Sequence, residues 1–294
     1  MDLEVAPEDL TAVAAFVAAR QTDPAHHIGY LSVEPEAIAV QLRGLEPLGT
    51  GGLVVARVRG RVVGALAAEW DEDPPRCWWH GPFVAPDADW REVGDALLDG
   101  ARRLLPATVT QEETCGDERH AWLADFATRH GFVAEEPSAV LVRDLDDGLP
   151  PVTVPVAARD DLTDAQRAEV AALHDRLFPG THTPGRRLVD GVDDNRLLVV
   201  LDDGRAIAYA AVERHEDDGS GYLDFLGVDA SARGRGLGAA LVAAACHEMR
   251  HGLGCLASSL TVRAGNAAAR RVYQRNGFVE ERVIVPFRRG FALT

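Results

Sequence analysis

Short apolar runs alternate along this chain of 294 residues with longer segments that repeat apolar positions every three or four residues. The short runs, for example residues 62–69 and 222–228, are bounded by glycine, proline or acidic residues, which predicts buried strands. The longer segments, for example 162–177 and 237–249, have the apolar spacing of helices. The alternation of the two kinds predicts an α/β protein.

The pattern occurs twice. The distance is 144 residues from Val84 to Val228 (228 − 84) and 146 residues from Gly131 to Gly277 (277 − 131). Each half therefore predicts the same unit, with a short strand, one or two helices, a strand meander, a long helix, a fifth strand, another helix and closing strands. The matched segments are 53–57 with 197–201, 62–69 with 206–213, and 131–133 with 277–279.

The two halves meet at residues 146–151, where acidic residues and two prolines favour an exposed linker. We therefore expect an N-terminal domain at 1–145 and a C-terminal domain at 152–294. Two copies in one chain form a pseudo-dimer, so we expect a monomer. Asp202-Asp-Gly204 predicts a hairpin between two strands of the second half.

An Arg/Gly-rich turn lies between a predicted strand and a predicted helix in the second half. It reads Arg233-Gly-Arg-Gly-Leu-Gly238. Glycines let successive backbone N–H groups approach an anion, the helix N-terminus adds partial positive charge, and the arginines add full charge. The turn predicts a site for a nucleotide-type diphosphate, although a tight connection would have the same composition.

Downstream residues add a second motif. A strand-like run at 258–263 is followed by Asn266, Ala269, Tyr273 and the Gly277-Phe278 pair. In this order and at these spacings the second half resembles the GNAT family of acyl-CoA-dependent N-acyltransferases. The family's acceptor loop, Arg or Gln, two residues, Gly, one residue, Gly or Ala, is met by Arg233, Gly236 and Gly238.

The resemblance implies a fold and a cofactor. The fold is two tandem GNAT units of the α/β (α+β) class, each a mixed, mostly antiparallel sheet with a splayed fourth and fifth strand pair, flanked by helices. The cosubstrate is acetyl-CoA or a related acyl-CoA, whose pantetheine would pair with the backbone where the strands splay. The expected cofactor-binding residues are Leu226, Gly227, Val228, Arg233, Gly234, Arg235, Gly236, Leu237, Gly238, Asn266 and Ala269. Gly227 would suit a β-bulge there.

Some of these residues have a structural alternative. Arg233 could pair with a nearby acid on the surface, and Asn266 is a preferred residue for capping the Ala-rich helix that follows it. Tyr273 could be an ordinary core aromatic beside Phe278. In the family, the tyrosine at this position protonates the departing thiolate, and the resemblance implies that role for Tyr273.

The base that takes the amine proton is open. Many family members place a glutamate early in the fourth strand, where this chain has Tyr222. Asp224, two residues along, shares a strand face with that position because strand side chains alternate, and is the first candidate. Glu213 and His215 are alternatives, and a water chain could also carry the proton.

The acceptor side is expected from the segment between the first helices of the second half, residues 178–184, with His182 as a polar contact. The strand-like segment 283–288 is expected to close the other wall. Together these features predict an N-acetyltransferase that acts on a small-molecule amine by direct attack.

The first half has lost both motifs. By the valine offset, Asp89 replaces Arg233 and Glu92 replaces Gly236, so that carboxylate charge and bulk would block a pyrophosphate. By the Gly-Phe offset, His120 and Ala127 stand where the second half has Asn266 and Tyr273. We therefore expect a single active site, in the C-terminal half.

Composition narrows the partners. The net charge of −16 argues against nucleic acid and suits a cationic amine, and it disfavours an aminoacyl transferase that uses tRNA. All 30 basic residues are arginine, which excludes self-acylation on lysine. The four cysteines lack metal-ligand spacing, so we expect buried free thiols and no metal.

No apolar run reaches the roughly 20 residues needed to cross a bilayer, and the N-terminus is acidic, so we expect a cytoplasmic protein. A non-catalytic acyl-CoA-binding or sensing protein is the competing function. It would keep the phosphate loop but would not need Tyr273.

Overall fold

The computed structural model describes residues 1–7, 9–72, 74–146, 148–181, 183–191, 195–215 and 218–290. The chain forms two compact units. The first consists of Met1–Ser138 and Val283–Thr294, and the second of Ala139–Arg282.

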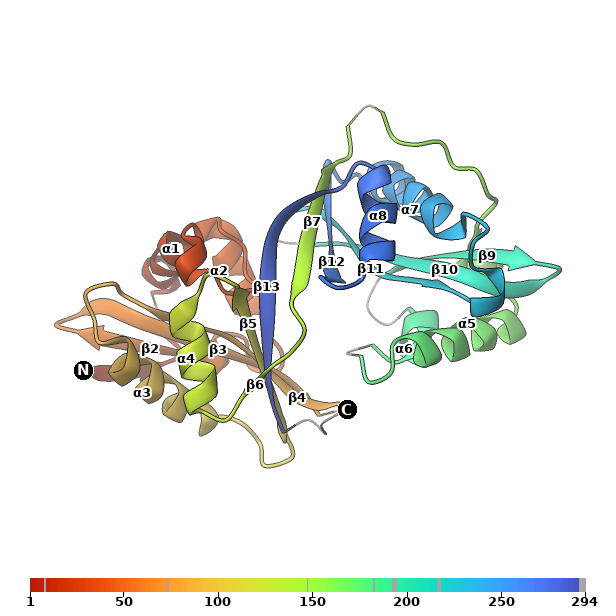
Figure 1. Cartoon of the computed structure of the whole chain (residues 1–294). Helices are drawn as coiled ribbons and strands as arrows, with labels where there is room; N and C mark the ends of the chain where they lie inside the picture. Colours follow the sequence, from red (N-terminus) through yellow and green to blue (C-terminus); the bar gives the residue numbers. More distant parts are fainter. Residues whose placement is uncertain are drawn as a thin grey trace. The chain divides into compact units, whose positions relative to one another are not determined.

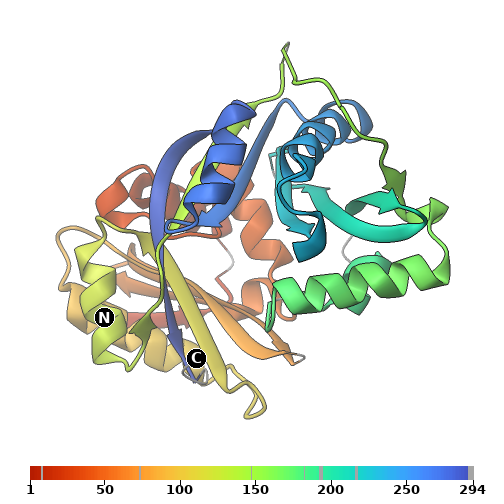
Figure 2. The ribbon, with the colours of Figure 1, turned by 45° about the vertical axis from the view of Figure 1, so that its right-hand side comes forward.

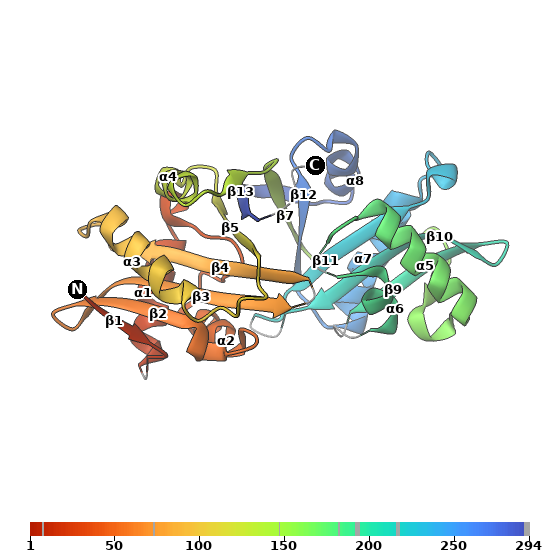
Figure 3. The same ribbon diagram turned by 90° about the horizontal axis from the view of Figure 1, so that it is seen from below.

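The first unit is built on one mixed sheet, in the order β1-β2-β3-β4-β5-β13, with β6 also paired to β13. Its pairs are antiparallel except β4 with β5, which is parallel. Figure 3 shows the neighbouring strands β2, β3 and β4. The strands are β1 (Asp2–Val5), β2 (Leu53–Val58), β3 (Arg61–Glu72), β4 (Pro75–Val84), β5 (Gln111–Asp117), β6 (Val133–Ala134) and β13 (Val279–Arg289).

Helices cover both faces of this sheet. In Figure 1, α1 and α2 lie on one side of β2 and β3, and α3 on the other. Seven consecutive residues of β3, Val62 to Ala68, are buried, which a strand covered on both faces requires. The helices are α1 (Leu10–Gln21), α2 (Pro35–Gly44), α3 (Trp90–Arg102) and α4 (Ala121–Arg129).

The second unit repeats this plan. Its sheet has the order β7-β12-β11-β10-β9-β8; β11 with β12 is again a parallel pair, and β11 with β10, β10 with β9 and β9 with β8 are antiparallel. In Figure 1, α5 and α6 lie on one side of β9 and β10, and α7 and α8 on the other. The strands are β7 (Ser138–Asp144), β8 (Ala157–Ala158), β9 (Arg196–Asp202), β10 (Arg205–Arg214), β11 (Gly221–Val228) and β12 (Ala257–Arg263); the helices are α5 (Asp164–Leu177), α6 (Gly185–Asp190), α7 (Leu237–His247) and α8 (Ala267–Arg275).

Local signals set the ends of these elements. Thr163 and Gln166 form a capping box at the start of α5, because each side chain bonds the other's backbone N–H. The expected hairpin at 202–204 is present, with Asp202 paired to Arg205. The apolar sequence of α7 is buried almost throughout, since this helix packs against β10 and β11.

The halves of the chain exchange their closing strands. Residues 284–289 of β13 pair with β5, which Figure 2 shows as a blue strand running beside a yellow one, and Phe287 joins the core of the first unit. In return β7 lies next to β12, and Ala139, Leu141 and Leu145 join a core of the second unit. The sequence predicted that segment 283–288 closes the other wall of the second-half site. The segment instead supplies a strand to the first unit.

The compact units thus differ from the two sequence halves by this exchange. The alternation of apolar and polar residues in a closing strand fits the edge of either sheet, because both sheets have the same architecture. The sequence pattern therefore predicts the strand but not its partner.

All four cysteines, Cys77, Cys115, Cys246 and Cys255, are buried free thiols, as expected. Within the described ranges, no helix has both the length and the apolar character needed to cross a membrane.

Candidate active site

The Arg/Gly-rich turn of the second unit is an exposed loop that leads into α7. Gly234 and Gly236 adopt φ values of 78° and 80°, in the left-handed region that glycine enters without strain. Gly236 is the N-cap of α7 and provides no side-chain hydrogen bond to it. The N–H groups of the first turn of a helix have no intrahelical acceptor, so this turn presents donors and a positive dipole end to an anion.

Side-chain contacts fix both ends of this loop. Asp229 accepts hydrogen bonds from the backbone N–H and the hydroxyl of Ser231 and pairs with Arg176 at 2.8 Å. These groups hold the pKa of Asp229 below its usual value, the Ser231 hydrogen bonds most of all. Arg235 pairs with Asp202 at 2.7 Å, while the exposed Arg233 forms no ion pair with any described residue.

The parallel pair β11 and β12 splays. Pairing covers only Gly221 with Ser258 and Tyr222 with Ser259, although both strands continue for several residues. The opening between the strands therefore begins after Tyr222, and the expected pantetheine-binding residues 226–228 follow it.

A β-bulge lies at Asp224. Leu223 pairs with Val212 and Phe225 with Ala211, so Asp224 is the extra residue. Leu223 and Phe225 accordingly enter different apolar clusters, on opposite faces of the sheet. Gly227, where the sequence suggested a bulge, pairs regularly with Tyr209.

Gly227 has a different structural reason to be glycine. A Cβ there would lie 2.5 Å from Cε1 of Tyr209, too close for any side chain. The absent side chain lets the fully buried Tyr209 ring pack against β11. Burial, and then the charges of Asp224 and Asp175, raise the pKa of Tyr209 well above its usual value.

Asn266 and Tyr273 lie at the two ends of α8. The Asn266 side chain caps the helix by accepting from the Ala269 N–H at 3.1 Å. Tyr273 is half-buried with its ring 6.0 Å from that of Phe278, and burial raises the pKa of Tyr273 to about 12. The capping role suggested by the sequence is present, and the phenol remains protonated at neutral pH.

Tyr222 connects the predicted catalytic residues. Its pKa is raised by burial, then by the charge of Asp224, and further by Glu213 and Tyr273. Glu213 lies directly opposite Tyr222 in the β10–β11 pair, and the His215 ring stacks on Tyr222 at 5.4 Å. Both candidate carboxylates and the candidate acid thus act electrostatically on one phenol, at the position where the resemblance implied a glutamate.

A buried polar chain on the α5 face of the sheet was not predicted from the sequence. His174 of α5 lies 2.6 Å (Nδ1) from the Tyr209 hydroxyl and 2.8 Å (Nε2) from the carbonyl oxygen of Thr183. Both rings are completely buried. A histidine on the apolar face of 162–177 was the available signal. His182, the polar contact expected in this segment, lies outside the described residues.

The corresponding loop of the first unit is three residues shorter. The N-cap of α3 is Asp89, five positions after Val84 (89 − 84), whereas Gly236 lies eight positions after Val228 (236 − 228). The expected match of Glu92 with Gly236 is therefore wrong, because Glu92 lies inside the first turn of α3. Asp89 instead accepts from the N–H groups of Arg91 and Glu92, both at 3.0 Å. A carboxylate of the chain itself occupies this helix N-terminus.

The strand opening of the first unit is also filled. β4 and β5 pair only from Arg76 to Trp78, as in the second unit. Beyond this pairing, Ile28 forms a bridge with Gly116, and the Gly29 N–H donates to the Cys115 carbonyl at 2.9 Å. The Thr114 hydroxyl bonds the carbonyl oxygens of β4 at Trp79 and Gly81, at 3.3 and 3.1 Å.

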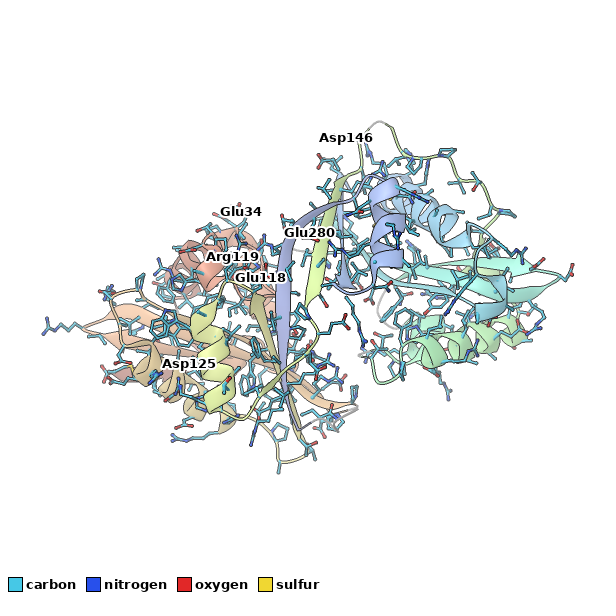
Figure 4. The ribbon with its side chains drawn as sticks, viewed as in Figure 1. Glu34, Glu118, Arg119, Asp125, Asp146 and Glu280 are labelled. Carbon is cyan, nitrogen blue, oxygen red and sulfur yellow. The ribbon has the colours of Figure 1, made fainter. Side chains whose placement is uncertain are left out.

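Helices α3 and α4 of the first unit are tied together by ion pairs. Asp125, labelled on α4 in Figure 4, contacts Arg91 at 3.3 Å and Arg129 at 3.1 Å, and Arg129 also contacts Asp95 of α3 at 2.7 Å. His120 caps α4 by accepting from the Leu123 N–H, as Asn266 caps α8.

Burial, and then the neighbouring His26 and His27, lower the pKa of His120 to about 3, so its ring is the neutral acceptor that a cap requires. No group of three or more potential metal ligands occurs in the part of the chain that the structure describes.

Comparisons with known proteins agree with this geometry. The sequence model of the acetyltransferase (GNAT) family matches residues 162–278. A mycothiol acetyltransferase of Mycobacteroides abscessus is 32% identical over 209 residues, which cover 66% of this chain and 69% of that protein.

Solved structures extend the likeness to both halves. A GCN5-related N-acetyltransferase from Sphaerobacter thermophilus superposes with a TM-score of 0.74 at 20% identity, over 98% of this chain and 95% of its own. A tandem GNAT protein from the clavulanic acid biosynthesis pathway gives 0.65 at 18% identity, over the whole of both chains. The predicted fold class is confirmed, and the first half also has a GNAT-like fold.

Proposed function

The chain belongs to the GNAT family of acetyltransferases, and on that premise we propose that it transfers an acetyl group from acetyl-CoA to a small-molecule amine at a single site in the second unit. The observation that carries the proposal is the contrast between two equivalent clefts. The cleft of the second unit has an uncapped helix N-terminus and a splayed strand pair. The cleft of the first is capped by Asp89 and filled by residues 27–29.

The cofactor would lie along β11. Backbone N–H groups from Gly234 to Gly238 would bind the pyrophosphate, with Arg233 adding charge. Pantetheine would pair with β11 at 226–228, which directs the thioester toward the bulge at Asp224. Residues 226–228 of β11 would thus hold the acyl group close to the candidate carboxylates Asp224 and Glu213.

The reaction is a direct transfer. The neutral amine attacks the thioester carbon, the C–N bond forms, and the C–S bond breaks with its electron pair on sulfur. We assign removal of the amine proton to the carboxylates Asp224 and Glu213, and protonation of the thiolate to Tyr273.

The proton transfer from Tyr273 is uphill in isolation. A pKa of about 12 for Tyr273 exceeds that of an ordinary thiol, about 8.5, by about 3.5, which corresponds to about 5 kcal/mol. Desolvation of the thiolate in the same cleft raises the thiol pKa as well and narrows this difference. Tyr273 would therefore donate its proton only as the C–S bond breaks.

The acceptor is proposed to be a small cationic amine. The carboxylates at Asp224 and Glu213 and the net charge of −16 favour such a substrate. The relative described above is a mycothiol acetyltransferase. We therefore include the acceptor of mycothiol acetyltransferases with aminoglycosides, amino acids and polyamines in the panel that tests this proposal.

Two measurements test the function. Acetyl-CoA should raise the melting temperature, because a ligand at 100 times its Kd stabilises the folded state by about 2.7 kcal/mol. At least one panel amine should release CoA thiol at a rate above hydrolysis. No melting shift would refute the cofactor site, and a shift without transfer to any amine would favour an acyl-CoA-binding protein.

The Tyr273→Phe variant tests the acid. It should lower the rate of CoA release by about tenfold or more, since general acid catalysis contributes about 10²-fold to 10⁴-fold. Acetyl-CoA affinity should stay similar, because the ring remains beside Phe278. Undiminished turnover would remove Tyr273 from this role.

A further inference from the structure

The two units place the segment between their first two helices differently. In the first unit this segment crosses the strand opening, where the Gly29 N–H and the His27 carbonyl bond the backbone of β5. In the second unit Phe178, which begins the equivalent connection, packs on the α5 face, where its ring lies 5.2 Å from that of Phe225. The first segment fills its strand opening, whereas the second packs through Phe178 on the α5 face of β11.

Each segment is held by a buried side chain from the helix that precedes it. Gln21, at the end of α1, donates to the carbonyls of Ile28 and Leu31, both at 2.9 Å, and accepts from the Ile28 N–H at 2.8 Å. His174 of α5 bonds the Thr183 carbonyl instead. The difference between the two clefts thus coincides with a difference in these contacts.

The contacts of His174 fix which nitrogen carries the hydrogen in its neutral form. A carbonyl can only accept, so Nε2 carries the hydrogen donated to Thr183, and Nδ1 of the neutral ring accepts the Tyr209 O–H. The Tyr209 ring is in turn held against β11 by the missing side chain of Gly227. The chain Tyr209–His174–Thr183 therefore ties segment 178–184 to the strand that lines the cleft.

We propose that His174 and Tyr209 are positioning residues that hold Thr183, and with it the connection after α5, on the α5 face and thereby keep the opening between β11 and β12 free for acyl-CoA. The inference rests on the proposed function, because it concerns the same cleft. Residues 27–29 of the first unit show that the chain itself can fill an opening of this kind, and loss of the His174 contacts would release the connection after α5 from the α5 face. The loss of the clamp also leaves a buried carbonyl and a buried hydroxyl without partners, which further favours rearrangement.

Two replacements of His174 separate hydrogen bonding from packing. His174→Phe keeps a ring between Phe178 and Phe225 but can neither donate nor accept, whereas His174→Gln loses the ring and retains a donor and an acceptor. Calorimetric titration with acetyl-CoA should show a Kd raised by about tenfold in His174→Phe, and a Kd close to that of the wild type in His174→Gln. Tyr209→Phe, which removes only the hydroxyl, should show an intermediate increase.

Tyr30→Phe is the matched control, because it removes a hydroxyl that donates to Glu113 at 2.6 Å in the first unit. It should leave the Kd for acetyl-CoA unchanged. Wild-type affinity in both His174→Phe and Tyr209→Phe would overturn the inference, as would a weakening in His174→Gln equal to that in His174→Phe. Should His174→Phe fail to unfold cooperatively, Tyr209→Phe decides the question.

The tautomer gives a second readout that needs no ligand. Long-range ¹H–¹⁵N correlation should show His174 protonated at Nε2 and unprotonated at Nδ1. The opposite tautomer would overturn the clamp geometry. If the wild-type protein itself fails to bind acetyl-CoA while the tautomer is as stated, the proposed function fails and the clamp geometry stands.

Discussion

The two units of this chain share one architecture but differ at every point where an acyl-CoA would touch them. The helix N-terminus at Gly236 has no side-chain cap, and the one at Asp89 is capped by its own carboxylate. Tyr273 in α8 and Ala127 in α4 occupy the same position in their helices, so the first unit has no phenol there. In the first unit the chain's own polar groups satisfy the backbone donors that a cofactor would use, which is the basis of the proposal that only the second unit binds acyl-CoA.

The strand exchange is the feature whose disruption should have the largest effect. Phe287→Ala should destabilise the first unit by about 3–5 kcal/mol, and Leu141→Ala the second by about 2–5 kcal/mol, because each removes a buried side chain. Hydrogen exchange should accelerate in β5 for the former and in β12 for the latter. The 61% exposed Val279, replaced by alanine, is the control on β13 and should change stability little. Faster exchange in β12 rather than β5 for Phe287→Ala would contradict the exchange of strands.

The open helix N-terminus can be closed in the manner of the first unit. Gly236→Asp places a carboxylate at the N-cap position that Asp89 has in the first unit and should weaken acetyl-CoA binding by about 100-fold, or about 2.8 kcal/mol, through charge repulsion and bulk. Gly254→Asp is the control. Gly254 lies in the same unit, has a similar left-handed φ of 74°, and has open space where a Cβ would lie, so the two substitutions carry similar backbone strain. Equal binding by Gly236→Asp and Gly254→Asp would rule out the proposed pyrophosphate site.

The reverse change should not open the first unit. Asp89→Ala should cost about 1 kcal/mol of stability through loss of the α3 cap, and Asp89→Asn, which can still cap, should cost less. Acetyl-CoA should still bind with a stoichiometry of one per chain, because the loop stays three residues short and residues 27–29 still fill the opening. A second bound equivalent in titration calorimetry would show that the cap alone closes this cleft.

The smallest effect concerns pH. Burial raises the pKa of Tyr273 to about 12, so the phenol stays protonated, and able to donate, as the pH rises from 7 to 10. The rate of acetyl transfer should therefore show no loss from Tyr273 ionisation over this range. A fall in rate centred near pH 10 that disappears in Tyr273→Phe would show that the phenol is less buried than the structure indicates.

Local sequence signals predicted most of the fold. The hairpin at Asp202–Gly204 and the helix cap at Asn266 were predicted because they depend on neighbouring residues. The capping box at Thr163 and the cap at His120, which were not predicted, are equally local. The candidate site was predicted where residues are close in the chain, as in the Arg/Gly-rich turn. The sequence did not predict the contact between His174 and Tyr209, because these residues are 35 positions apart and meet only through packing of α5 on β10.

The bulge at Asp224 shows why finer details escaped the sequence. An extra residue in a strand follows from how two strands pair, and the composition of one strand does not reveal it. The loop deletion before Asp89 was hidden for a similar reason, since a constant offset between the halves cannot show where three residues are missing.

The sequence by itself determined two α/β units, the Arg/Gly-rich turn and the signature residues from Asn266 to Phe278, because apolar periodicity, glycine conformation and helix capping act over a few residues. Tertiary structure alone decided that β7 and β13 change units and that residues 27–29 close one cleft while His174 holds 178–184 beside the other. These outcomes depend on which of several compatible strand edges and buried polar partners a segment meets, and only the folded chain makes that choice.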